Sequence, residues 1–420
     1  MKKLIKNNIF LTILTIIPII TLLIGFAFDE DFSTGGASWD FNLTWPIIVD
    51  YSNFNFTLAD DQFTMAHMPL HYALLSFLYS IFNDQNIVRI IYLILSLLLP
   101  FFLYLNLTKI YNQDKFILII FSISFLFFPF FRASAIWANS HLTATIFFLI
   151  GNYFYLKSKE ENVFAYKIFN LLFLSFAIYS IQSYLILFLY YLYNYFSSEK
   201  FNNFIKLFLF SAILALPGLF FISLNPRLGS VKSYITQDLL ATILTNFSII
   251  FFFLSFILIN KENISIILDK IKVLKKIEII GILFLIVFVF YIQQFLHFDP
   301  RLKGGGFFNK LSYLVLNNNF IFVVSSILGL ITTYIITKQD PKFLYVITIM
   351  NLMSLNYLTY QKYFEPLFLI IVAILFKNFL INNILSSFKN TLLFYGIIFL
   401  YFVVGYINFS NEWTYRLLSQ

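Results

Sequence analysis

Residues 29–88 read DEDFSTGGASWDFNLTWPIIVDYSNFNFTLADDQFTMAHMPLHYALLSFLYSIFNDQNIV and form a long segment that is neither basic nor apolar enough to cross a bilayer. The segment contains eight acidic residues and no Lys or Arg. An apolar run, 8–28, precedes it and is about as long as the roughly 20 residues that a spanning helix needs. Cytoplasmic loops are rich in Lys and Arg, and this segment has neither. We therefore expect residues 29–86 to form a first extracytoplasmic loop that contains the catalytic residues.

The composition excludes an ordinary soluble globular protein. Sixty per cent of the residues are hydrophobic, 11% are charged and the mean hydropathy is +0.83, which predicts an all-α polytopic membrane protein. The net charge of +8 comes from Lys in short loops between apolar runs, so the expected partner is a lipid bilayer and not nucleic acid. The absence of Cys excludes disulfides, thiolate metal sites and Cys nucleophiles. The excess of Lys, Asn, Ile and Phe is typical of an AT-rich bacterial genome and favours the bacterial inner membrane.

The apolar runs predict a single membrane domain over residues 1–420. Thirteen runs are expected to span the bilayer, near 8–28, 87–107, 116–131, 135–156, 163–181, 183–196, 204–224, 239–259, 277–297, 319–337, 343–360, 367–385 and 390–409. The run 69–82 is shorter than a span requires and is expected to lie at the interface. If it spanned the membrane, every later loop would change side. The first run lacks a small-residue cleavage site, which favours a retained anchor over a signal peptide.

The basic residues divide unevenly between the two faces that this topology defines. With the N-terminus inside, 19 of the 28 basic residues fall on the cytoplasmic side, as the positive-inside rule expects. The other nine include all five arginines of the chain: Arg89, Arg132, Arg227, Lys232, Arg301, Lys303, Lys310, Lys362 and Arg416. A guanidinium binds phosphate through a planar fork, whereas an ammonium is a point charge. This division favours a phosphate-binding role for the outer face.

Two motifs in the first loop resemble those of a known family. The acidic triplet Asp29, Glu30 and Asp31 follows the first helix directly, and the loop later reads His67-Met-Pro-Leu-His-Tyr72. This pattern resembles the first loop of the GT-C glycosyltransferases, which include the protein O-mannosyltransferases and the lipid A aminoarabinose transferases. The usual form of the second motif is His-Pro-Pro-Leu-Tyr-Tyr, so Met and His replace one Pro and one Tyr here. The resemblance covers mainly the first third of the chain.

The resemblance implies inverting transfer of a sugar from a polyprenyl-phosphate donor to a lipid, glycan or protein acceptor on the extracytoplasmic face. It implies that Asp29 or Glu30 takes the acceptor's proton, with the neighbouring acid orienting the base or helping to hold a divalent cation, Mg or Mn. All three acids of the triplet are therefore catalytic candidates, and the residues alone leave open which one acts. The alternative is that the triplet only marks a solvated helix end.

Further polar residues are candidates for holding the substrates. The histidines can exchange protons near neutral pH, polar groups in apolar helices are costly and often functional, and the cations suit a phosphate. A glycine-rich segment, 297–310, permits the motion of a lid, and Lys362 stands where the resembled family has Arg in an Arg-Tyr-x-x-Pro turn. The substrate-binding candidates are Asp60, Asp61, His67, His71, Arg132, Asn139, His141, Arg227, Arg301, Lys303 and Lys362. Solvated turns and helix-packing contacts are the alternative interpretation of each.

Two other functions fit a polytopic chain. A transporter or flippase of lipid-linked sugars predicts inverted repeats and charges near the middle of the membrane, whereas the charges here gather at one face. An O-antigen-type polymerase usually has its largest outer loop late in the chain. The sequence therefore favours the glycosyltransferase.

Overall fold

The structure is a computed structural model, and it describes residues 2–32, 36–54, 67–224, 239–292, 306–354 and 360–418. Every regular element in these ranges is a helix, which confirms the all-α class. The chain groups into two compact units, Met1–Ser230 with Tyr395–Gln420, and Val231–Phe394. A single functional domain over residues 1–420 stays a prediction.

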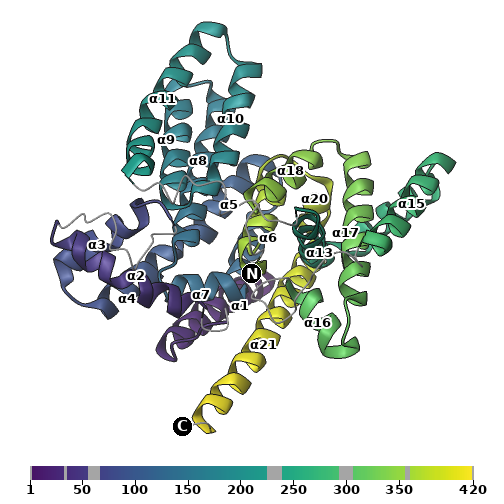
Figure 1. Ribbon diagram of the computed structural model, residues 1–420, viewed down its shortest axis with the longest axis horizontal. Coiled ribbons are helices and arrows are strands. Elements are labelled where there is room, and N and C mark those ends of the chain that lie inside the picture. The colour runs from purple at the N-terminus through teal and green to yellow at the C-terminus, as the bar shows by residue number, and fades with distance from the viewer. Residues whose placement is uncertain are drawn as a thin grey trace. The chain divides into compact units, whose positions relative to one another are not determined.

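The first unit is a helical bundle that contains both long and short helices. Figure 1 shows α8, α9, α10 and α11 running side by side in it. Its elements are α1 (Lys2–Ala27), α2 (Gly36–Ser52), α3 (Leu70–Phe82), α4 (Gln85–Ser96), α5 (Leu98–Ile110), α6 (Lys115–Ser124), η1 (Phe125–Phe127), α7 (Pro129–Ile136), α8 (Ser140–Glu161), α9 (Phe164–Ser180), η2 (Gln182–Tyr184), α10 (Leu185–Ser198) and α11 (Phe201–Leu224).

The second unit is organised around the packing of α13 on α17. Gly329 of α17 permits this close approach, because a Cβ there would lie 2.1 Å from the Phe247 carbonyl oxygen. Its elements are α13 (Leu239–Leu258), α14 (Lys261–Lys272), α15 (Lys276–Ile292), α16 (Gly306–Leu316), α17 (Phe320–Gln339), α18 (Phe343–Met353), η5 (Gln361–Tyr363), α19 (Leu367–Ile374), α20 (Phe379–Leu385) and the start of α21 (Phe388–Leu418).

Length and hydropathy identify the helices that can cross a membrane. Among the described residues six helices qualify, or up to eight if each of two bent pairs counts as one span. The bent pairs fall on the expected spans 116–131 and 367–385, where the chain turns by 70° and 90°. The first turn has a physical cause, since Pro129 begins a new helix in which its missing N–H costs nothing. Several long apolar helices confirm an integral membrane protein; the count of thirteen spans stays a prediction.

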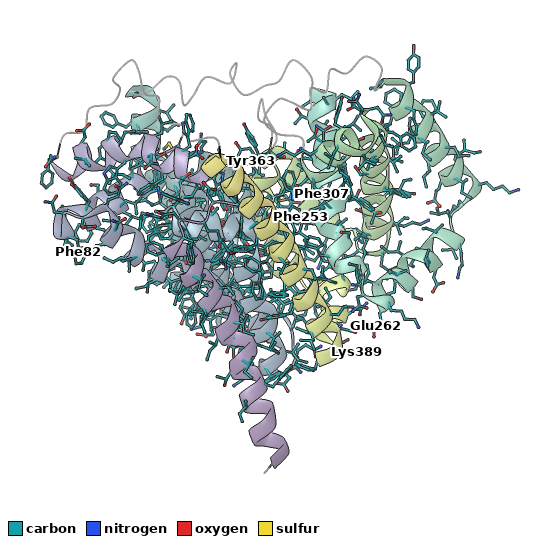
Figure 2. The ribbon with its side chains drawn as sticks, turned by 90° about the horizontal axis from the view of Figure 1, so that it is seen from below. Phe82, Phe253, Glu262, Phe307, Tyr363 and Lys389 are labelled. Atoms are coloured by element: carbon teal, nitrogen blue, oxygen red, sulfur yellow. The ribbon has the colours of Figure 1, made fainter. Side chains whose placement is uncertain are left out.

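Within each unit, the loops expected on one side of the membrane meet at one end. In the first unit, Lys109 pairs with Glu160 and Lys167 with Glu199, each at 2.6 Å. In the second unit, Figure 2 shows Glu262 and Lys389 together at one end, apart from Phe307 and Tyr363. The side of the membrane on which each loop lies stays a prediction.

Helix α1, which leads to the acidic triplet, contains a proline whose missing donor is compensated from another helix. Pro18 has no N–H, so it cannot donate to the carbonyl oxygen of Leu14 four residues earlier. The hydroxyl of Tyr395, on α21, donates to that oxygen at 2.9 Å. This bond joins α1 to α21 at a point that the sequence of α1 alone leaves unsatisfied.

Replacing Tyr395 by Phe is expected to lower the free energy of unfolding by about 1–3 kcal/mol, because the buried carbonyl of Leu14 loses its donor. In a Pro18→Ala background the restored amide can bond that carbonyl, so the same change should cost less, with a coupling of about 1 kcal/mol. Equilibrium unfolding of the two single variants and the double variant in mixed micelles measures the coupling. Equal costs of Tyr395→Phe in both backgrounds would contradict this account.

Candidate functional site

The C-terminus of α1 places the acidic triplet. Asp29 adopts a left-handed backbone conformation, with φ of 49°. The amide of Glu30 donates to the Gly25 carbonyl at 2.9 Å, and the amide of Asp29 donates to Phe26 at 3.2 Å. These are the two hydrogen bonds of a Schellman motif. The motif reverses the chain, so that Glu30 folds back over Gly25 while Asp29 projects outward.

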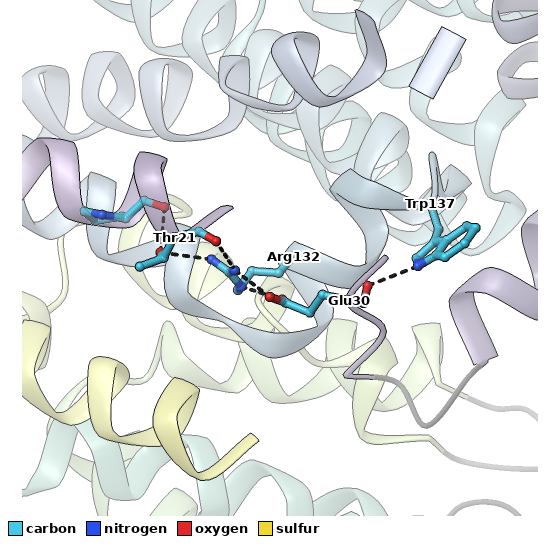
Figure 3. A network of polar contacts seen from close by, with 5 residues as sticks. Thr21, Glu30, Arg132 and Trp137 are labelled. Carbon is cyan, nitrogen blue, oxygen red and sulfur yellow. Dashed lines mark hydrogen bonds and ion pairs between the residues drawn. The ribbon is translucent and has the colours of Figure 1, made fainter. Parts of the chain in front are cut away.

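Glu30 forms a buried, two-pronged ion pair with Arg132 of α7 (Figure 3). Arg132 Nε donates to Glu30 Oε1 at 2.6 Å and Nη2 donates to Oε2 at 2.7 Å. Arg132 Nη2 also donates to the Thr21 carbonyl at 2.7 Å, and Trp137 Nε1 donates to the Glu30 carbonyl at 3.0 Å. The Arg132 side chain is 0% exposed and that of Glu30 is 3% exposed. Burial raises the pKa of Glu30, and the hydrogen bonds from Arg132 oppose that rise.

Gly25 makes room for this pair. A Cβ at position 25 would lie 2.2 Å from Glu30 Oε2 and 2.7 Å from Arg132 Nη2. Glycine is otherwise a poor residue for the interior of an apolar helix. Its presence in the last turn of α1 is explained by the carboxylate and guanidinium that it accommodates.

Gly25→Ala is expected to lower the free energy of unfolding by about 1–3 kcal/mol, because the methyl group overlaps the ion pair. Helix propensity alone predicts the opposite sign, a gain of about 1 kcal/mol. The matched control is Gly396→Ala in α21, where a Cβ would meet nothing within 4 Å, and this change should stabilise. Thermal unfolding of both variants shows whether each change raises or lowers the stability. A stabilised Gly25→Ala variant would contradict the close packing of the ion pair on Gly25.

Asp29 occupies the opposite environment, at the surface. Its Oδ1 accepts a hydrogen bond from Arg89 Nη2 at 2.6 Å, yet 63% of the Asp29 side chain is exposed, against 8% for Arg89. The guanidinium of Arg89 lies 4.0 Å from the ring centroid of Trp137 and 5.1 Å from that of Phe26, distances typical of cation–π contacts. A buried cation therefore holds an exposed carboxylate at the end of α1.

Asp31 supports the neighbouring helix. Asp31 is 4% exposed, and its Oδ2 accepts a hydrogen bond from the Ser38 amide at 2.7 Å. Ser38 lies in the first turn of α2, where backbone amides have no partner within the helix and a negative charge is favourable. Asp31 is thus a capping residue, and the three adjacent acids have three different roles.

The arrangement of Asp29 and Glu30 does not fit the divalent cation that the sequence resemblance implies. Each carboxylate is already neutralised by a guanidinium at 2.6 Å, and a cation brought to either one would be repelled by that guanidinium. Within the described residues no group of three or more His, Asp or Glu side chains is placed to hold a metal ion.

A turn between α7 and α8 joins the two ion pairs to the histidines. Side chains from α3 and α4 donate to three of its carbonyl oxygens: Arg89 Nε to Ile136 at 3.1 Å, His71 Nε2 to Ala138 at 2.8 Å and Tyr92 Oη to Asn139 at 2.8 Å. Ala138 has φ of 45°, a conformation that costs a non-glycine residue about 1–2 kcal/mol. These donors hold the turn, and with it Trp137, beside Asp29 and Glu30.

The three described histidines have different environments. His71 is 2% exposed; since its Nε2 donates to Ala138, its Nδ1 is left to accept from Thr143 at 2.9 Å. Burial lowers the pKa of His71 to about 3, so it is a neutral structural residue. His67 and His141 are half-buried, and their rings lie edge to face with centroids 5.4 Å apart. A substrate-binding role for His67 and His141 stays a prediction.

The structure shows the contacts of three further substrate-binding candidates, whose functional roles stay predictions. Arg132 is buried and paired with Glu30, and the Asn139 side chain caps α8 by accepting from the His141 amide at 3.0 Å. Lys362 lies in the second unit, over the ring of Tyr360 at 5.3 Å. The remaining candidates lie outside the described residues: Asp60, Asp61, Arg227, Arg301 and Lys303.

Two residues that the sequence does not single out prove central. Arg89 belongs to the outer arginine set but has no role assigned from the sequence, and Tyr92 looks like an ordinary interfacial aromatic residue. Their spacing is a signal, because residues three apart lie on the same face of a helix. An arginine and a tyrosine three residues apart in an apolar helix, just after an acidic loop, predict that both side chains make polar contacts.

The fold and these two acid–arginine pairs define the class of the protein: an all-α integral membrane protein with a polar centre where its first long helix ends. The chain matches no protein-family model, no curated protein and no solved structure. The glycosyltransferase resemblance therefore stays a prediction.

Proposed function

We propose that the protein is a membrane glycosyltransferase of GT-C type, with about thirteen membrane-crossing segments. It moves a sugar from a polyprenyl-phosphate donor to a lipid, glycan or protein acceptor, with inversion. The reaction takes place on the extracytoplasmic face of what we propose to be a bacterial inner membrane. The observation that carries this proposal is the exposed carboxylate of Asp29, held by the buried Arg89 where the first spanning helix ends.

Asp29 has the properties that a general base requires. Of the three acids in the triplet, it alone has an exposed side chain, whereas Glu30 and Asp31 are engaged in buried contacts. Arg89 restricts the carboxylate to one orientation without burying it. A base must reach the acceptor's proton within hydrogen-bonding distance, and of the three acids only Asp29 has a carboxylate that an incoming acceptor can reach.

The proposed reaction is a single displacement at the anomeric carbon. The acceptor oxygen forms a bond to that carbon as the bond to the phosphate oxygen breaks, and polyprenyl phosphate leaves with the bonding electron pair. The acceptor's proton passes to Asp29 and then to solvent. Inversion needs one base and no carboxylate nucleophile. The half-buried His67 and His141 pair is a candidate to contact the sugar or its phosphate.

Glu30 and Arg132 act as positioning residues in this proposal. Their pair joins the end of α1 to α7, and Trp137 bonds the Glu30 backbone while stacking under Arg89. The orientation of Asp29 therefore depends on a rigid buried scaffold. This support from packing is what a base needs to keep a reactive geometry.

Proteoliposomes containing the full chain test the function. The probes are undecaprenyl-phosphate mannose and undecaprenyl-phosphate glucose, each labelled in the sugar, with a membrane lipid extract as acceptor. Transfer predicts that the label leaves the polyprenyl phosphate in wild type and stays on it in Asp29→Asn. Movement of the intact labelled lipid across the bilayer, equal in both proteins, would instead support a flippase.

A further inference from the structure

Helix α14 (Lys261–Lys272) is held against the second unit by one side. Asn263 is fully buried; its Nδ2 donates to the carbonyls of Ile257 at 3.0 Å and Leu380 at 3.1 Å, and its Oδ1 accepts from Asn383 Nδ2 at 2.9 Å. These bonds connect α14 to the end of α13 and to α20. The side of α14 that carries Asn263 therefore faces the protein, and the opposite side faces outward.

The length of α14 and its link to α13 restrict it to the membrane boundary. Twelve residues make a helix of about 18 Å, which is too short for a hydrocarbon core of roughly 30 Å. The candidate span α13 ends at Leu258, and α14 begins at Lys261. Three residues of extended chain reach at most about 10 Å, so α14 begins close to the point where α13 leaves the hydrocarbon.

The outward side of α14 is divided into an apolar and a polar sector. With about 100° between successive residues, Ile264, Leu268 and Ile271 share one sector of the helix. They are 42%, 51% and 42% exposed, respectively. Ser265 lies further round, in the polar sector, and is also exposed. An exposed apolar stripe beside a polar sector is the pattern of a helix that lies in a membrane interface.

The charges on the polar sector are ordered by their distance from the stripe. On the same helical geometry, Lys261 and Lys272 lie next to Leu268, whereas Asp269 and Glu262 lie further round. Lys272 pairs with Asp269 at 2.9 Å, but both side chains are largely exposed, at 73% and 64%, and such pairs are weak. Lysines at the edge of the stripe can extend their charged ends to headgroup phosphates, while the acids stay on the side facing water.

We propose that α14 lies in the plane of the membrane interface, with Ile264, Leu268 and Ile271 inserted among the lipids and with Lys261 and Lys272 bound to anionic phospholipid headgroups. This surface is independent of the proposed glycosyltransferase site, which lies in the first unit. The basic residues in and just after α14 are all lysines, and they belong to the set expected on the cytoplasmic face. The lipid that contacts this surface is therefore the anionic lipid of that leaflet.

The absence of cysteine from the chain allows a direct test by single-cysteine labelling. Ile264→Cys places a fluorescent label on the stripe, and Ser265→Cys, the adjacent exposed residue, is the matched control. The full-length protein is reconstituted in nanodiscs of phosphatidylcholine alone or with phosphatidylglycerol. Brominated phospholipid should quench the label at position 264 at least about twofold more than the label at 265, and iodide in the water should show the reverse order.

The lysines are tested in the same assay. Phosphatidylglycerol should increase the bromolipid quenching at position 264, and the double change Lys261→Gln with Lys272→Gln should abolish that increase while leaving the basal quenching in phosphatidylcholine. Equal bromolipid quenching at 264 and 265, or stronger iodide quenching at 264, would overturn the proposal and indicate a surface for a protein partner. An effect of phosphatidylglycerol that survives loss of both lysines would overturn the headgroup assignment.

Discussion

Replacing Arg132 by Met is expected to lower the free energy of unfolding by about 3–5 kcal/mol, because it leaves the buried Glu30 carboxylate without its partner. Both oxygens of that carboxylate are bonded to the guanidinium, and neither side chain is more than 3% exposed. Water therefore cannot replace the lost hydrogen bonds. Equilibrium unfolding in mixed micelles, followed by tryptophan fluorescence, measures the change.

The control variants separate a buried pair from an exposed one. Lys109→Met breaks a pair of the same length, but the side chains of Lys109 and Glu160 are 26% and 44% exposed, so the expected cost is only about 0–1 kcal/mol. Combining Arg132→Met with Glu30→Leu removes both charges and should recover much of the loss. A cost of Arg132→Met no larger than that of Lys109→Met would contradict the structural role of the pair.

The pH dependence of the Arg132→Met variant follows from the same pair. Burial raises the pKa of Glu30, and in the variant the opposing hydrogen bonds of Arg132 are gone, so that pKa rises further. A carboxyl with a raised pKa in the folded state binds protons more tightly when folded than when unfolded. The stability of the variant should therefore increase as the pH falls through the raised pKa, and its deficit from wild type should be largest above that pKa. A deficit that is constant with pH would argue against a buried charge as its cause.

Asp29→Asn is expected to reduce sugar transfer by about 10²–10⁴-fold, the usual contribution of a general base. The amide keeps the size of the side chain and can still accept from Arg89, but it cannot take up the acceptor's proton. Because the Asp29 side chain is 63% exposed, the free energy of unfolding should change by less than about 1 kcal/mol. Initial rates in proteoliposomes, compared with unfolding of the same preparations, separate a catalytic loss from a structural one.

The neighbouring acids serve as controls for the assignment of the base. Asp31→Asn removes a charge from the cap of α2 and should leave most of the transfer rate, because Asp31 is buried against Ser38. Glu30→Gln should lower stability and rate together. A folded Asp29→Asn protein with the wild-type rate would place the base elsewhere in the loop, and the candidates Asp60 and Asp61 would be tested next.

The order of apolar and polar segments made most of the helices predictable. Inside a lipid bilayer the backbone N–H and C=O groups must be paired with one another, and a sufficiently long apolar run achieves this as a helix. Helices α1, α11, α13 and α17 accordingly fall close to their expected ranges. The bends at 128 and near 376 were not predicted, because an apolar composition does not show where neighbouring helices interrupt a span. Similarly, Pro18 shows that Leu14 lacks a donor but not that Tyr395 supplies one.

The sequence alone determined that this chain is a helical membrane protein. The lengths of the apolar runs and the distribution of charge depend on many residues together, so no single contact has to be known to read them. It also marked the end of the first helix as unusual, through three adjacent acids and an outer set of arginines. Only the tertiary structure decided which acid pairs with which arginine. Along a turn, one step of one residue can move a side chain from the surface to the interior. Asp29 is therefore exposed, Glu30 is paired in the core and Asp31 caps a helix. Neither composition nor spacing predicts these three different environments.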